Sequence, residues 1–339
     1  MFGIIEDDPF LPIKKLIKEG FGLPEPKNVK AMSGGLINET YDIDGIWVLQ
    51  WVNPVFGAAV NDDIAALVPI LQKRGVCVPL LCAPAGGGWS VDGADFGLKP
   101  GRWRLMTMLS GTSRDSAGSI EQIRSLTRAL ASFHGALNDC HYVFKHQRPC
   151  VHEFMRHYRA LEQVLETDEY RMHRLYQKVS ELFEKIKALS KFVDFDSVMA
   201  CEDLRIIHGD PKISNFLMKD DDVVGIVDLD TMARSRVSFD IGDAIRSWCN
   251  PRREDEEPAY NREYAREVLG LYMEEAPFLT RSERESLPSS SAFISLELSM
   301  RFARDAIRED YFGFNPEIGH GEHSLMRAEA MYLLCNQML

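Results

Sequence analysis

Residues 206–231, IIHGDPKISNFLMKDDDVVGIVDLDT, limit the fold of this chain more than any other stretch. The short apolar runs RII, FLM and VVGIVDL in or next to it predict strands, and the exposed turn KDDD joins the last two. Asp210 and Asn215 follow the first run, and Asp228 ends the last. A hairpin returns Asp228 to the first loop, so we expect these three side chains to converge.

This arrangement suits phosphoryl transfer. The reaction needs a carboxylate that orients a hydroxyl nucleophile, hard oxygen ligands for Mg²⁺, and a cation near the moving phosphoryl group. Kinases supply these with Asp-x-x-x-x-Asn followed by an Asp after a strand. Asp210, Asn215 and Asp228 repeat that order, with Lys212 two residues after Asp210. Loop-capping hydrogen bonds would explain any one of these residues, but they explain the ordered set less well.

The character of the chain changes near residue 110. Before it, residues 12–20 and 61–75 have helix signals, with Asn61 as the expected N-cap, and the intervening and following text predicts strands. The polar stretch LSGTSRDSAG marks the expected boundary. Beyond it, apolar periodicity predicts helices over residues 119–137, 168–192, 261–275, 291–309 and 322–338. We therefore expect an α+β chain with a small β-rich domain, 1–109, and a larger, mainly helical domain, 110–339.

Composition excludes several classes of function. A formal net charge of −12 argues against a general binder of nucleic acid or anionic membranes. Seven cysteines without CxxC pairs favour neither a disulfide framework nor a zinc site. The N-terminal MFGIIEDDPF is acidic where a secretory signal is basic, and no apolar run reaches the ~18 residues of a membrane helix. We expect a soluble cytoplasmic protein, either a monomer or a homodimer.

The motifs HGDPKISN and IVDLDT resemble those of the aminoglycoside phosphotransferase and choline kinase superfamily. GGLINETYDIDGIWVLQWVN, FDIGDAIR, LELSMRFARDAIREDYF and AEAMYLL extend the resemblance, over most of the chain, to the branch that contains N-acetylhexosamine 1-kinases. The resemblance implies a protein-kinase-like bilobal fold. It also implies ATP- and Mg²⁺-dependent phosphorylation of a small hydroxyl compound, such as the anomeric hydroxyl of a sugar.

By this resemblance, Asp210 is the catalytic base and Lys212 neutralises charge on the γ-phosphoryl group. Asn215 and Asp228 are the expected Mg²⁺ ligands. His208 is expected to support the loop from the core, and Asp243 is expected to brace it from the following helix.

By the same resemblance, the nucleotide is expected in the first domain. Gly34 and Gly35 would form the turn over the phosphates, and Met106 and Met108 would contact the adenine. Kinases usually place a Lys on the third strand, whereas this chain has Gln50 there. The sugar-kinase branch also has Gln at this position. It tends to have Asn before the catalytic Asp, where this chain has Gly209.

The acceptor is expected on the helical side. Asp230 would share a face with Asp228, and Arg246 would contact phosphate or substrate or else form a structural salt bridge. Arg301 and Asp305 are four residues apart and share a helix face, so they would either line the acceptor pocket or form an exposed ion pair.

Two classes of function remain open: an active small-molecule kinase and a catalytically silent kinase-like binding protein. The missing third-strand Lys motivates the second, and the complete Asp210, Asn215 and Asp228 set favours the first. Within the enzyme class, choline, another amino alcohol or an aminoglycoside is the alternative acceptor.

Overall fold

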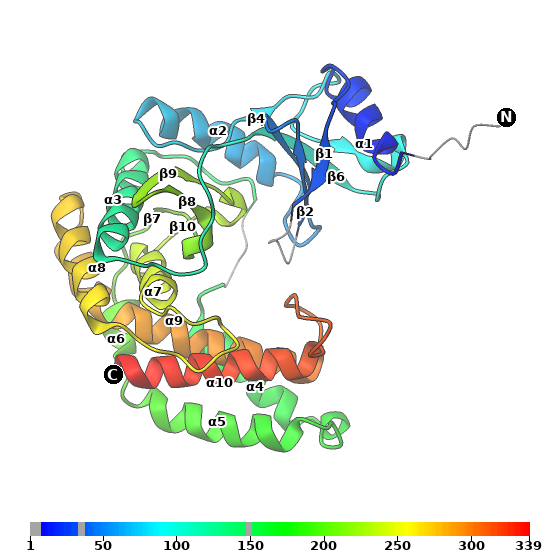
Figure 1. Cartoon of the computed structure of the whole chain (residues 1–339). Coiled ribbons are helices and arrows are strands. Elements are labelled where there is room, and N and C mark those ends of the chain that lie inside the picture. Colours follow the sequence, from blue (N-terminus) through cyan, green and yellow to red (C-terminus); the bar gives the residue numbers. More distant parts are fainter. Residues whose placement is uncertain (1–7, 33–37, 147–150) are drawn as a thin grey trace. The chain divides into compact units, whose positions relative to one another are not determined.

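The computed structural model describes residues 8–32, 38–146 and 151–339, and the chain forms two compact units (Figure 1). Unit 1 comprises Met1–Ser110 and Tyr142–Gln147, and unit 2 comprises Gly111–His141 and Arg148–Leu339. The sequence did not predict that the chain returns to unit 1 at Tyr142.

Unit 1 is built on an antiparallel sheet. Its strands are β1 (Val29–Ala31), β2 (Glu39–Ile43), β3 (Trp47–Trp51), β4 (Leu81–Cys82), β5 (Val91–Asp92) and β6 (Arg102–Thr107). The order is β1-β2-β3-β6-β4, and β5 also pairs with β6. Because side chains alternate along a strand, Leu49 and Leu105 face one side of the sheet while Gln50 and Arg104 face the other.

One face of this sheet is covered by the first helical segment, α1 (Leu11–Lys15), which continues as a π-helical turn, Leu16–Gly20. Ile13, Leu16 and Ile17 pack there against buried Trp51 and Trp103. Helix α2 (Val60–Lys73) follows β3. Its N-cap is Ala59 rather than the expected Asn61, whose amide instead accepts a hydrogen bond from Arg104.

The returning segment 142–147 is tied to α2 by one carboxylate. Asp63 is buried and accepts hydrogen bonds from the Tyr142 hydroxyl (2.7 Å), Lys145 N (2.8 Å) and His146 N (2.8 Å). Three donors from a much later part of the chain therefore complete unit 1.

Unit 2 is mainly helical. Its α-helices are α3 (Ile120–Leu137), α4 (Phe154–Glu166), α5 (Tyr176–Ser190), α6 (Phe195–Met199), α7 (Val237–Trp248), α8 (Arg262–Glu275), α9 (Arg281–Arg308) and α10 (His320–Met338). Helix α9 is the centre, because α4, α5, α6, α7 and α10 all pack against it. Figure 1 shows α9 and α10 side by side. No helix within the described ranges has the length and apolarity to cross a membrane.

Two helix predictions in unit 2 were wrong at their ends. The predicted helix 291–309 begins earlier, at Arg281, because Thr280 and Glu283 form a complete capping box and Pro288 is accommodated inside the helix. The predicted helix 168–192 is divided into a 3₁₀ turn, Asp168–Tyr170, and α5. Helix α4 was not predicted.

Four short strands interrupt these helices. β7 (Arg205–Ile207) pairs with β10 (Ala233–Ser235), and β8 (Phe216–Lys219) pairs with β9 (Asp222–Ile226). The exposed residues Asp220 and Asp221 form the turn between β8 and β9, as expected. Helices and antiparallel strands together confirm the predicted α+β class.

Helices α7 and α9 approach each other closely at Gly242. A Cβ at this position would lie 2.5 Å from the Ser290 carbonyl oxygen, far inside van der Waals contact. Since α7 also carries residues that reach the loop of Asp210, this close approach sets the distance between the loop and the helical core.

We expect Gly242→Ala to lower the free energy of unfolding by about 1–3 kcal/mol, because the added methyl group must push two packed backbones apart. Gly270→Ala is the matched control. A Cβ at Gly270, in α8, would meet open space, so alanine should stabilise that helix by about 0.5–1 kcal/mol. Urea unfolding of both variants measures the difference, and equal effects would contradict the close-packing explanation.

Candidate active site

The loop after β7 is held by a carboxylate of α7. Asp240 Oδ2 accepts a hydrogen bond from His208 N (2.7 Å), and Oδ1 accepts one from Gly209 N (2.8 Å). The expected brace was Asp243, and this expectation was wrong. Asp243 lies almost one turn later on α7 and pairs with Arg246 at 2.7 Å. Asp240 thus fixes the two residues immediately before Asp210.

Asp240 is 1% exposed, and its environment favours the ionised form. Burial alone would raise the pKa of this carboxyl, but the His134 hydrogen bond and the Gly209 amide outweigh it, so the pKa is lowered. His134 Nε2 lies 3.0 Å from Asp240 Oδ2, and its Nδ1 lies 2.7 Å from the Tyr272 hydroxyl. A buried chain from α8 through α3 therefore ends at the loop.

His208 and Gly209 shape the loop itself. His208 is completely buried, and its Nε2 lies 3.0 Å from Val227 O, which is consistent with the expected supporting role. Gly209 has φ +84°, and a Cβ there would lie 2.2 Å from Thr231 O. Any side chain at residue 209 would separate this loop from the Thr231 segment, which explains why Asn does not occur here.

The structure brings the predicted catalytic-loop residues together. Val227 N donates a hydrogen bond to Asn215 O (2.9 Å), which places the end of β9 beside the loop. Lys212 Nζ lies 2.9 Å from Asp210 Oδ2, and Asn215 Nδ2 lies 3.3 Å from the same oxygen. Both contacts go to Oδ2, which leaves Oδ1 of this partly exposed carboxylate without a partner in the described part of the chain.

Lys212 is held in its charged form. Burial acts against the ammonium, but the Asp210 and Asp228 charges dominate and raise the pKa of Lys212 well above its ordinary value. A lysine in this state carries a permanent positive charge beside Asp210 and cannot serve as a base at neutral pH.

The predicted metal ligands fit a cation. Asn215 Nδ2 donates to Asp210 O at 2.7 Å, so its Oδ1 is the atom left for a ligand. Burial, together with the Asp230 and Asp210 charges, raises the pKa of Asp228, and Lys212 only partly offsets this. Asp228 also has φ +65°, an uncommon conformation for a non-glycine residue. An oxygen-rich group with excess negative charge is the environment that Mg²⁺ prefers.

Arg246 forms a buried salt bridge, the structural alternative for this residue. Its guanidinium contacts Asp243 Oδ1 at 2.7 Å and Glu254 Oε1 at 2.9 Å, and it is 5% exposed. Arg327 contacts the other oxygen of Glu254, at 2.5 Å. Burial would raise the pKa of Glu254, but these two arginines hold it well below its usual range. Arg246 therefore supports α7 through this salt bridge, and its expected contact with phosphate or substrate stays a prediction.

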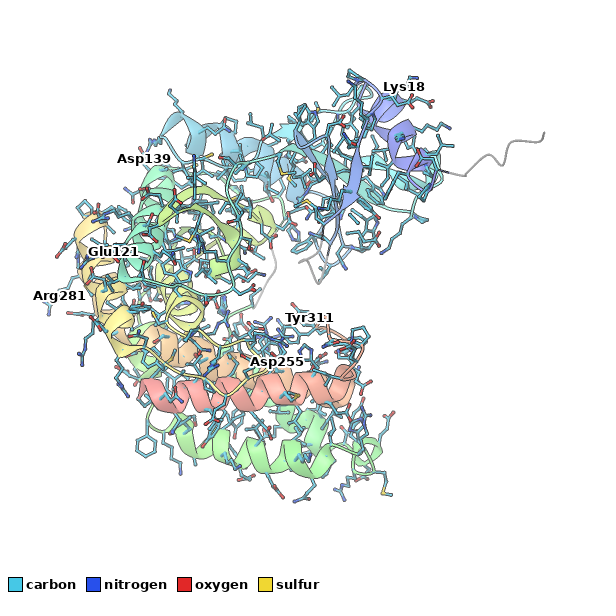
Figure 2. All side chains as sticks on the ribbon, viewed as in Figure 1. Lys18, Glu121, Asp139, Asp255, Arg281 and Tyr311 are labelled. Atoms are coloured by element: carbon cyan, nitrogen blue, oxygen red, sulfur yellow. The ribbon has the colours of Figure 1, made fainter. Side chains whose placement is uncertain are left out.

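Asp305 does not pair with Arg301, so the expected ion pair between these two residues was wrong. Asp305 is completely buried. Its carboxylate contacts Tyr311 N (2.8 Å), Asp310 N (3.2 Å), Ser324 Oγ (2.8 Å) and His320 Nε2 (2.8 Å). These contacts anchor the segment between α9 and α10, where Figure 2 labels Tyr311. No oxygen of Asp305 remains for an acceptor.

Arg301 belongs to a different cluster. Its side chain is only 14% exposed, yet within the described residues its guanidinium makes no hydrogen bond, only a 3.9 Å ion pair with Glu297 and ring contacts with Tyr311 and Phe312. Glu297 Oε1 also lies 3.1 Å from His152 Nδ1, while Glu297 Oε2 is buried with no described partner. We name Arg301, Glu297 and His152 the α9 cluster.

The α9 cluster lies within electrostatic reach of the loop. Burial is the main cause of the raised pKa of the Asp243 carboxyl; the Asp210 charge raises this pKa further, and His152 lowers it. Like Glu297, Asp243 has a buried oxygen, Oδ2, without a described partner. Asp230 is buried and close enough to Asp228 to raise the pKa of Asp228.

Sequence reasoning missed Asp240, His152 and Glu297. FDIGD offers two acids, and only the register of α7 distinguishes Asp240 from Asp243. His152 precedes an unpredicted helix, and Glu297 is the only charged residue of the α9 stretch ISLELSM, which was the available signal.

The nucleotide residues expected in unit 1 are partly described. Gly34 and Gly35 lie outside the described residues. Met106 and Arg104 are two residues apart on β6 and therefore face the same side of the sheet. Gln50 lies opposite Arg104 in the β3–β6 register. Met108 follows the strand and donates a backbone hydrogen bond to Ile46 O (2.8 Å).

Comparison with known proteins identifies relatives of this architecture. Residues 28–278 match the family model described as the phosphotransferase enzyme family, APH. A GDP and kanamycin complex of APH(2″)-IIIa has a TM-score of 0.63 and 15% identity, covering 95% of this chain and 98% of that one.

Two further solved structures are similar. The amicoumacin kinase hAmiN, in complex with AMP-PNP, Ca²⁺ and Ami, has a TM-score of 0.62 and 13% identity, covering 97% of this chain and 94% of that one. A choline/ethanolamine kinase family protein from Mesorhizobium loti has a TM-score of 0.54 and 17% identity, covering 96% and 97%. These likenesses confirm the expected kinase-like fold.

We expect Asp240→Asn to lower the free energy of unfolding by about 1.5–3 kcal/mol, because an amide cannot accept from both backbone N–H groups and His134. The folded-state pKa of Asp240 lies below the unfolded value of 3.8. Its stabilising effect is therefore complete above that value and is lost only as the pH falls through the lower, folded pKa.

Urea unfolding of Asp240→Asn should consequently still show the loss at pH 5 as well as at pH 7, because both lie above the pKa of Asp240. Asp196→Asn, at an exposed carboxylate, is the control and should change little. A loss that largely disappears at pH 5 would contradict the lowered pKa of Asp240.

Proposed function

The chain belongs to the phosphotransferase enzyme family, and from this premise we propose that it transfers the γ-phosphoryl group of ATP to a hydroxyl group of a sugar such as an N-acetylhexosamine. The observation that carries the proposal is the orientation of Asp210. Lys212 and Asn215 both contact Oδ2, so Oδ1 is available to a hydroxyl group.

In the proposed reaction, Asp210 Oδ1 accepts the acceptor's hydroxyl proton as the oxygen attacks the γ-phosphorus. The bond between that phosphorus and the β–γ bridging oxygen breaks, and ADP leaves. A positioned carboxylate orients the nucleophile, and the phosphoryl group carries spread negative charge that nearby cations stabilise. Lys212, whose raised pKa keeps it charged, supplies such a cation beside Asp210.

Asn215 and Asp228 are the proposed ligands of Mg²⁺, together with oxygens of the nucleotide. When bound, the metal would neutralise phosphate charge. This chain's contribution is to orient the Asn215 amide through Asp210 O and to hold the Asp228 carboxylate in an environment short of positive charge.

The α9 cluster supports a polyhydroxylated acceptor. Arg301 offers donors, whereas Glu297 Oε2 and Asp243 Oδ2 are acceptors without described partners. A sugar hydroxyl can donate and accept at once, so one ligand can satisfy both kinds of group. The quaternary ammonium of choline has no N–H to donate to these two oxygens. The cluster therefore favours a polyhydroxylated acceptor over choline.

The test is an ATP-consumption screen over hexosamines and their N-acetyl forms, neutral sugars, amino alcohols and aminoglycosides. The product is then located by ³¹P and ¹³C NMR. We expect phosphorylation of an N-acetylhexosamine at the anomeric position. Turnover of only amino alcohols or aminoglycosides would overturn the sugar assignment. Nucleotide binding without turnover of any class would favour the silent binding protein.

Asp210→Asn should reduce turnover by roughly 10²–10⁴-fold, because the amide cannot accept the hydroxyl proton. Nucleotide affinity, measured by calorimetry, should stay near wild type. Retention of more than about a third of the wild-type turnover would remove Asp210 from the role of base.

Arg301→Ala should raise the acceptor KM or lower kcat for the true acceptor, while ATP affinity and the melting temperature stay close to wild type. Arg304→Ala is the matched control on α9, since Arg304 contacts Asp310 at 3.1 Å on a more exposed surface. Equal acceptor kinetics in the two variants would place the acceptor away from the α9 cluster.

A further inference from the structure

The last turn of α7 holds the loop after β7 at a second place, beyond the carboxylate contacts described above. Trp248 Nε1 donates a hydrogen bond to Pro211 O (2.9 Å), and Ser247 Oγ accepts one from Ile213 N (3.0 Å). Pro211 and Ile213 are the two neighbours of Lys212 in the chain. The backbone is therefore anchored to α7 on both sides of this lysine.

The contact with Ser247 takes the place of a helix cap. Ile213 begins a 3₁₀ turn, Ile213–Asn215, whose N-cap residue is Lys212. An N-cap side chain normally accepts a hydrogen bond from a backbone N–H group of the first turn, but a lysine side chain has no acceptor. The Ser247 hydroxyl accepts this hydrogen bond instead. The Lys212 ammonium group contacts Asp210 Oδ2, at 2.9 Å.

Trp248 is a rigid support for the other side of the lysine. Its side chain is 1% exposed, and its ring packs edge-on against Phe216 of β8, with the ring centroids 5.3 Å apart. The Pro211 carbonyl belongs to the peptide plane that joins Pro211 to Lys212, and the proline ring restricts φ of Pro211. The indole hydrogen bond therefore fixes the plane from which the Lys212 side chain starts.

Lys212 depends on such support. Lysine is a point charge on a flexible four-carbon stem, and this side chain is 40% exposed. The position of its ammonium group is set by the contact with Asp210 and by the backbone from which the stem projects. A displacement of about 1 Å at a catalytic group can cost roughly 100-fold in rate.

We propose that Trp248 and Ser247 are positioning residues for phosphoryl transfer, which hold the Lys212 ammonium beside Asp210, where the γ-phosphoryl group would be transferred. The inference rests on the proposed function, in which Lys212 stabilises the transferred group. In this role both residues act through the backbone next to Lys212 rather than on a substrate.

The alternative is that Trp248 and Ser247 only stabilise the fold. The two roles differ in how their loss combines with the loss of Lys212. A positioning residue has little left to do once the lysine side chain is gone. A purely structural residue lowers kcat by the same factor with or without the lysine.

The experiment is a double-mutant cycle on kcat, with melting temperature and ADP affinity measured in parallel. Trp248→Phe removes the indole N–H and should lower kcat roughly ten- to hundredfold. In a Lys212→Ala background the same change should alter kcat by less than about twofold. ADP affinity should stay within about twofold of wild type, because ADP lacks the γ-phosphoryl group.

Ser247→Ala is a smaller change, so it tests the inference even if Trp248→Phe fails to fold. It should lower kcat roughly three- to tenfold, and by less than about twofold in the Lys212→Ala background. Asn215, at the end of the same 3₁₀ turn, keeps its hydrogen bond to Asp210 O, so the effect should act through Lys212.

Each variant has a matched control. Trp103 in unit 1 is also 1% exposed, and its indole N–H also donates to a backbone carbonyl, Lys99 O, at 2.9 Å. Ser125 on α3 also accepts a backbone hydrogen bond, from Val223 N at 2.9 Å. Trp103→Phe and Ser125→Ala should lower the melting temperature about as much as their counterparts and leave kcat within about twofold of wild type.

Equal effects on kcat with and without Lys212 would overturn the inference and leave the proposed function in place. The same holds if Trp248→Phe lowers kcat no more than Trp103→Phe, or if kcat is unchanged in Ser247→Ala. Wild-type protein that phosphorylates none of the acceptor classes would overturn the proposed function and this inference with it.

Discussion

The paired hydrogen bonds from His208 N and Gly209 N to Asp240 are the constraint on which the site depends. They convert a glycine-containing loop, which would otherwise be entropically costly to order, into a rigid platform for Asp210. Asp240 stays ionised because the hydrogen bond with His134 offsets the cost of burying its charge. The close contact between α7 and α9 at Gly242 fixes the distance between these two helices. The geometry at Asp210 is therefore set mainly by buried residues of α3 and α7.

Three of the cations around this platform each lie beside a carboxylate. Lys212 lies beside Asp210, Arg246 beside Asp243, and Arg327 beside Glu254. Arg301 differs, because its 3.9 Å ion pair is long and Glu297 keeps one buried oxygen without a described partner. Incomplete pairing is costly in a folded protein, and the proposed acceptor would complete it at the α9 cluster.

The sequence predicted the functional side chains of the loop better than the residues that hold the loop in place. Asp210, Asn215 and Asp228 are recognisable because their spacing is local and follows two strand signals. Asp240 and Asp243 could not be distinguished, since the register of a helix against a distant loop is a tertiary property. Asp305 and Arg301 share a helix but not a partner, because residues of the segment 310–324 bind the carboxylate while the guanidinium lies near Glu297. Long-range partners of this kind leave no periodic signal.

The return of residues 142–147 to unit 1 has a consequence for how the chain can be divided. Asp63 lies in α2, but its three described donors come from this later segment. A fragment ending at Ser110 would bury a carboxylate with none of these donors, or leave α2 partly detached. Unit 1 is thus discontinuous in sequence. Its folding cannot be completed during synthesis until helix α3, which belongs to the other unit, has also emerged.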